Sequence, residues 1–88
     1  MPDPVKFAKA KRRLRKFLRR TIRESAQLQR DIAYWNQHRL DAAPFDAGGD
    51  RVVEQLAQQC LDLVEAERPL PSALWNRLVT QLEANARA

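Results

Sequence analysis

The stretch KFAKAKRRLRKFLRRTIR, residues 6–23, combines a strong charge with a helical apolar pattern, and the rest of the chain is interpreted from it. Ten of its eighteen residues are Lys or Arg and none is acidic. Its larger apolar residues recur at helical spacing: Phe7, Leu14, Phe17, Leu18 and Ile22. The pattern predicts an amphipathic helix that packs on its apolar side and meets an anion on the other.

Most of these cations fall opposite the apolar residues. When Leu14 and Leu18 are taken as positions d and a of a heptad, eight cations occupy positions b, c or f. These eight are the predicted anion-binding residues: Lys6, Lys9, Arg12, Arg13, Lys16, Arg19, Arg20 and Arg23. Lys11 and Arg15 are the two cations outside these positions. Because like charges on one helix repel each other, we expect an anionic partner to relieve that repulsion.

The composition favours one small all-α domain, 1–88. Its 88 residues fall below the roughly 100–150 residues of a typical domain, so a partner chain is one way to complete the core. A hydrophobic content of 44% and a charged content of 31% argue against a disordered chain. Two glycines and few β-branched residues favour helices over strands.

The charge is distributed unevenly. Residues 1–23 carry ten bases and one acid, a net charge of +9, whereas residues 24–88 carry six bases and ten acids, a net charge of −4. The chain is therefore predicted to consist of a basic helical arm, 1–23, and a mildly acidic helical body, 24–88. Such asymmetry favours nucleic acid, an anionic membrane or an acidic protein as the partner.

The cysteine content and the hydropathy bear on the compartment. Cys60 is the single cysteine, which excludes an intrachain disulfide and is typical of a reducing environment. No apolar run approaches the roughly 20 residues that cross a bilayer, and no uncharged apolar segment follows the paired arginines as an export signal requires. We expect a cytoplasmic protein.

Turn-forming residues divide the chain into three helices, at about residues 4–40, 50–67 and 72–86. Prolines and glycines mark the two connections: Pro44, Gly48, Gly49, Pro69 and Pro71. The three helix starts are predicted to be capped by Asp3, Asp50 and Ser72. Pro4 at the first helical position adds to the first start signal.

Two arrangements of these helices are compatible with the pattern. In the favoured one, a small helical bundle, the shorter helices fold back on residues 22–40, pack against Leu28, Ile32 and Trp35, and leave the basic half protruding. In the other, they run end to end along the first helix as a bent hairpin. Phe45 in the first connection is expected to fold onto the core. The apolar face at residues 7–18 then needs cover, which a homodimer would provide.

The sequence offers little for catalysis, so we expect a protein that is not an enzyme and holds no cofactor. His38 is the single histidine and is interpreted as a surface residue, and Cys60 as a buried structural thiol. One Cys and one His cannot supply the four ligands of a zinc site. The acids Asp62, Glu65 and Glu67 are expected to form a solvated face or to pair with bases of the long helix.

Among anionic partners, the pattern favours the phosphate backbone of nucleic acid, bound with little sequence specificity. Phe7 and Phe17 lie on the apolar side, so the cations offer no stacking platform for unpaired bases. No Asn or Gln lies between the cations to contact base edges. The alternatives left open are an adaptor or assembly subunit that docks on an acidic protein, and an anionic membrane surface.

Overall fold

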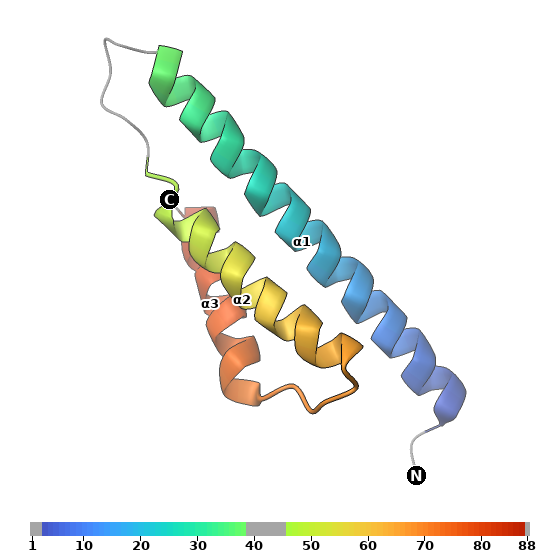
Figure 1. The fold of residues 1–88 in the computed structure, drawn as a ribbon. Helices are drawn as coiled ribbons and strands as arrows, with labels where there is room; N and C mark the ends of the chain where they lie inside the picture. Colours follow the sequence, from blue (N-terminus) through green and yellow to red (C-terminus); the bar gives the residue numbers. More distant parts are fainter. Residues whose placement is uncertain (1–2, 39–45, 88) are drawn as a thin grey trace.

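The computed structural model describes residues 3–38 and 46–87 (Figure 1). They form three helices, α1 (Pro4–His38), α2 (Gly48–Glu65) and α3 (Ser72–Arg87), and this part of the chain contains no strand. The predicted all-α class with one long and two short helices is confirmed. The molecule measures about 60 × 20 × 19 Å, because α1 extends well beyond the helices packed on it.

The helices form a bundle with α2 in the middle. Figure 1 shows α2 running back along α1 and α3 turning back along α2. Gly49, near the start of α2, lies so close to Asn85 of α3 that a Cβ would collide with the amide oxygen. The backbones of α1 and α3 stay apart within the described residues, and Phe17 and Trp75 bridge them with ring centroids 6.2 Å apart. A small helical bundle is thus confirmed and the bent hairpin is not observed, but only α2 folds back on α1, whereas α3 packs on α2.

The start of α1 confirms the predicted cap. Asp3 Oδ1 accepts a hydrogen bond of 2.9 Å from the backbone N–H of Val5, one of the first amides that lack a helical partner. A carboxylate at this end also favours the helix dipole, which the many cations of α1 oppose.

The caps predicted for α2 and α3 are wrong. Gly48 and Gly49 belong to α2 and not to the connection, and Asp46 Oδ1 accepts a 2.8 Å hydrogen bond from the Gly48 N–H. Asp50 therefore lies inside the first turn, where it is favourable for the helix dipole but is not the cap. Ser72 is the first residue of α3 itself. The helix α2 thus begins two residues earlier than predicted, whereas α3 begins at the predicted residue.

A Schellman motif ends α2. The N–H of Arg68 donates to the carbonyl of Leu63 (2.9 Å) and that of Glu67 to the carbonyl of Val64 (3.2 Å). Glu67 has a φ of 57°, the left-handed conformation that glycine adopts most easily. Pro69 follows two residues later and prevents the helix from continuing. The chain can therefore reverse direction and bring α3 against α2.

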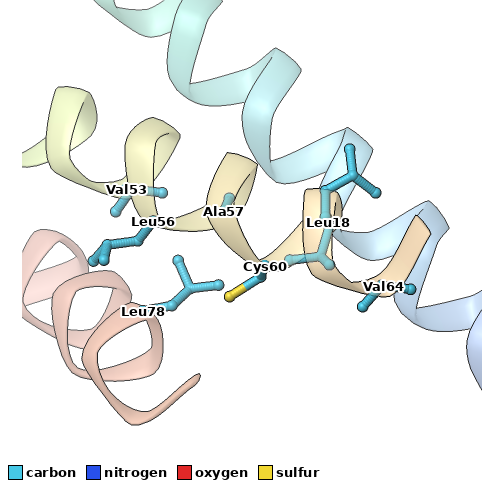
Figure 2. Packing of buried hydrophobic residues seen from close by; sticks show 8 residues of the cluster. Leu18, Val53, Leu56, Ala57, Cys60, Val64 and Leu78 are labelled. Atoms are coloured by element: carbon cyan, nitrogen blue, oxygen red, sulfur yellow. The ribbon is translucent and has the colours of Figure 1, made fainter. Parts of the chain in front are cut away.

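The buried core lies on α2 (Figure 2). Its apolar members are Leu18, Val53, Leu56, Ala57, Cys60, Leu61, Val64 and Leu78. Six of these eight come from α2, because the middle helix is covered on two sides. Side chains from α1, α3 and the α2–α3 connection complete the core as partly buried neighbours: Leu14, Phe17, Ile22, Leu70, Leu74, Trp75 and Leu82.

The packing predicted for α1 is wrong. Leu18, in the basic half, is fully buried, whereas Leu28 and Trp35 are 45% and 42% exposed and only Ile32 of the predicted contact residues is half-buried. The contact of α1 with α2 therefore begins in the basic half and continues past the buried Thr21 and Ser25 to Gln29, which donates a hydrogen bond to Glu54 of α2. The last turns of α1 project beyond α2 (Figure 1). The predicted role of Phe45 lies outside the described residues.

Candidate functional site

All eight predicted anion-binding residues are exposed on one side of α1. They form three rows with a spacing of seven residues, and together these rows are the cationic face. The rows are Lys6, Arg13 and Arg20; Lys9, Lys16 and Arg23; and Arg12 and Arg19. The face extends over residues 6–23, or about 26 Å at 1.5 Å per residue.

Helical periodicity and the packing of α1 explain this exposure. Leu14, Leu18 and Ile22 recur every four residues and contact the core, with Leu18 fully buried. The middle row, Lys9, Lys16 and Arg23, lies on the opposite side of a helix with 3.6 residues per turn. The segregation of charge predicted from the sequence is thus retained when the chain folds.

The two cations outside the rows point toward α2. Lys11 Nζ lies 2.8 Å from Glu67 Oε1, and the Nε of Arg15 is buried without a hydrogen-bond partner among the described residues. Arg15 lies one turn after Lys11 and one turn before Arg19, so the three form a stripe along the end of α2. Cations are favourable there, because the last carbonyl groups of a helix carry partial negative charge.

Arg19 belongs both to the cationic face and to the stripe of cations along the end of α2. It donates to Glu65 of α2, yet 55% of its side chain remains exposed. None of the other seven cations of the face forms an ion pair with a residue that the structure describes. The face thus has seven cations available for an external anion.

The acids of α2 divide into two groups. Glu65 and Glu67 pair with α1, which confirms one of the two predicted roles. Asp62 instead accepts a hydrogen bond of 2.9 Å from Gln58 on its own helix. The hydrogen bond from Lys11, and then the charge of that ammonium group, lower the pKa of Glu67. Glu67 is therefore ionised over a wider pH range than a free glutamate.

The remaining titratable residues offer no second site in the described part of the chain. Cys60 is fully buried, as predicted, and desolvation raises the pKa of its thiol. The imidazole of His38 lies against the ring of Tyr34, with centroids 4.3 Å apart. No group of three or more His, Cys, Asp or Glu side chains occurs that could hold a metal ion within residues 3–38 and 46–87.

A surface feature that the sequence did not predict lies beside the cationic face. An open groove of about 610 Å³ separates the start of α1 from the α2–α3 connection, and we call it the Phe7 groove. Its lining is mainly apolar: Phe7, Ala10, Lys11, Leu14, Val64, Glu67, Arg68, Pro69 and Leu70. A second hollow of about 370 Å³ shares Leu14 and Leu70 with it and extends the surface to Trp75.

One feature of the sequence, the heptad position of Phe7, pointed to this groove. Phe7 occupies an apolar heptad position two turns before Leu14, but it lies beyond the end of α2 and remains 63% exposed. Only the path of the α2–α3 connection places Pro69 and Leu70 opposite it. That path depends on the left-handed residue at the end of α2, which a sequence pattern based on Gly and Pro does not identify.

Comparison with protein-family models, curated protein sequences and solved structures gives no match for this chain. Across the described helices, none has both the length and the apolarity of a membrane-spanning segment.

Proposed function

We propose that the protein is a non-enzymatic binding protein whose cationic face contacts the phosphate backbone of nucleic acid with little sequence specificity. The observation that carries this proposal is the exposure of all eight cations, seven of them without an acidic partner among the described residues. Basic side chains in such an array bind phosphates and release counterions, and this is the main source of non-specific affinity for nucleic acid.

The geometry of the cationic face is better suited to a duplex than to unpaired bases. An α-helix with its side chains is about 10–12 Å across, close to the roughly 12 Å width of the major groove of B-form DNA. In that position the row of Lys9, Lys16 and Arg23 faces the groove, and the flanking rows face the two strands. Phe7 and Phe17 are directed to the other side of α1, so no aromatic platform stacks with unpaired bases.

The packing of α1 on the core makes an anionic membrane surface a less favoured partner than nucleic acid. An interfacial helix binds lipid by inserting its apolar side chains, and its affinity increases with the apolar area that it buries. In this protein Leu18 is fully buried, and Leu14, Phe17 and Ile22 are half-buried against the core. Membrane binding would require α1 to separate from α2, whereas phosphate contacts require no rearrangement.

Two other predictions about partners remain proposals. An acidic protein surface could occupy the same cations, and it would give salt-sensitive binding without affinity for a bare duplex. The homodimer was expected because Phe7, Leu14 and Leu18 needed cover. In the structure the core of one chain buries Leu18 and partly covers Leu14, whereas Phe7 remains 63% exposed.

The test is binding of the full chain to fluorescently labelled 20-base-pair DNA and RNA duplexes, measured by anisotropy at increasing salt. We expect binding at about 50 mM salt that weakens steeply, with a log–log slope of roughly 0.9 per phosphate contacted. Anionic vesicles and an acidic polypeptide serve as comparison ligands. Absence of duplex binding at about 50 mM salt, together with binding to either comparison ligand, would overturn the proposal.

A further inference from the structure

We propose that the Phe7 groove is a docking site for an amphipathic helix of another protein, whose apolar stripe is flanked by acidic residues. The inference rests on the groove and its charged border, and it does not depend on nucleic acid being the ligand of the cationic face. It adds a second partner to the first, at a separate set of side chains.

The floor of the groove is apolar and accessible. Phe7 is 63% exposed, an unusual state for a phenylalanine beside other apolar side chains, and Leu14 and Leu70 are half-buried. Pro69 adds an inflexible apolar wall. The volume of about 610 Å³ falls within the usual range of ligand-binding clefts, and the lining has few polar groups.

The dimensions fit a helix rather than a small molecule. Because the second hollow shares Leu14 and Leu70 with the groove, the apolar surface continues from Phe7 to Trp75. On α1 it covers the seven-residue interval from Phe7 to Leu14, a rise of about 10.5 Å. A helix that docks through residues i, i+4 and i+7 needs about 10.5 Å between its outer anchors. Three anchors therefore fit along this surface.

The border of the groove on α1 is cationic throughout. Residues three or four apart are neighbours on a helix surface, so Ala10 in the groove wall is flanked by Lys6 and Arg13. Both cations are exposed.

The opposite side of the groove has the same sign of charge. Arg68 lies in its lining, and the one acid there, Glu67, is already hydrogen-bonded to Lys11 at 2.8 Å. An apolar floor with cationic borders selects an apolar stripe with acidic flanks, and it repels a partner with basic flanks.

The two proposed ligands share two cations. Lys6 and Arg13 border the groove and also belong to the cationic face. Lys9, Lys16 and Arg23 lie farther around the helix and contact only the duplex. A peptide in the groove should therefore weaken duplex binding through the two shared cations, whereas loss of the middle row should leave peptide binding nearly unchanged.

The experiment uses an 18-residue synthetic peptide with leucines at i, i+4, i+7 and i+11 and glutamates beside them. The matched control peptide has the same leucines with lysines in place of the glutamates. Binding to the full chain is followed by tryptophan fluorescence in a Trp35→Phe background, so that Trp75 reports on the groove. We expect the glutamate peptide to bind at least about tenfold more tightly than the lysine peptide.

Two substitutions, at residues whose side chains are almost equally exposed, locate the peptide-binding site. Phe7→Ala should weaken peptide binding by about tenfold or more, as removal of a central aromatic anchor does. Val5→Ala, at a residue 62% exposed on another side of α1, should leave it unchanged. Phe7→Ala should also preserve duplex binding, so the two proposals can fail separately.

Three results would overturn the docking site. They are no binding of the glutamate peptide, equal binding of the two peptides, or equal effects of Phe7→Ala and Val5→Ala. Loss of duplex binding in Phe7→Ala, with its helical content intact by circular dichroism, would assign the groove to the nucleic-acid surface instead.

Discussion

Lys11 Nζ lies 2.8 Å from Glu67 Oε1 and connects the basic half of α1 to the turn that follows α2. Lys11 is one of the two cations that fall outside the rows of the cationic face, and this contact explains its position. Glu67 is the residue with a left-handed backbone at the end of α2. The pair thus joins the cation pattern of α1 to the turn that determines the direction of α3.

The position of the core on α1 can be tested with two leucines. Leu18→Ala should lower the free energy of unfolding by about 2–5 kcal/mol, because it leaves a cavity at a fully buried site. Leu28→Ala should have a clearly smaller effect, since Leu28 is 45% exposed. Urea denaturation of both variants measures the difference. Equal losses of unfolding free energy in the two variants would mean that the Leu28 side of α1 packs on α2 as closely as the Leu18 side.

The contribution of the cationic face to duplex binding can be separated from that of net charge by comparing two variants that lose the same number of positive charges. Replacing Lys9, Lys16 and Arg23 by Gln should weaken duplex binding and reduce the log–log salt slope by about 0.7–0.9 for each lost contact. The control replaces three exposed arginines of α2 and α3 by Gln: Arg51, Arg77 and Arg87. It removes the same charge from other surfaces, so an equal reduction in slope would show that net charge, and not the face, binds the duplex.

The stability of the fold should depend on pH through Glu67. Its pKa is lowered below 4.5 in the folded protein by the hydrogen bond from Lys11, so its contribution is present above pH 4.5 and is lost as the pH falls through the folded-state pKa. The thermal midpoint of the wild type should exceed that of Glu67→Gln at neutral pH, and the two should converge in acid. A difference that persists in acid would assign the effect to something other than ionisation.

The backbone of Glu67 gives a separate prediction. Glu67→Ala and Glu67→Gly both remove the ion pair, but glycine adopts a φ of 57° without the steric cost of a Cβ. The thermal midpoint of Glu67→Gly should therefore exceed that of Glu67→Ala by about 5 °C in a domain of this size. Equal midpoints would indicate that the left-handed turn is not maintained in solution.

The thiol of Cys60 reports on opening of the core. Burial raises its pKa above 9.0, and the folded protein excludes reagents from it, so the thiol should stay protonated and unreactive near pH 8. We expect a disulfide reagent to label it at least about 100-fold more slowly in the native protein than in urea, which corresponds to about 2.8 kcal/mol of opening free energy. Comparable rates would contradict a fully buried position.

The sequence predicted those features that depend on neighbouring residues alone. Three helices, the cap at Asp3 and the exposure of the eight cations follow from helical periodicity and from local hydrogen bonding. The start of α2 was predicted two residues too late, because Asp46 and Asp50 are both suitable caps at this spacing and the backbone decides between them.

Tertiary structure decided where along α1 the helix α2 packs. Both halves present leucine and aromatic residues at helical spacing, so periodicity could not distinguish the Leu18 side from the Leu28 side. The observed register places the acidic end of α2, with Glu65 and Glu67, against Arg19 and Lys11, and it buries Leu18 completely. The Phe7 groove arises from that register and from the direction of the α2–α3 connection. Charge segregation on one helix is therefore encoded locally, whereas the surface opposite Phe7 is created only when distant segments meet.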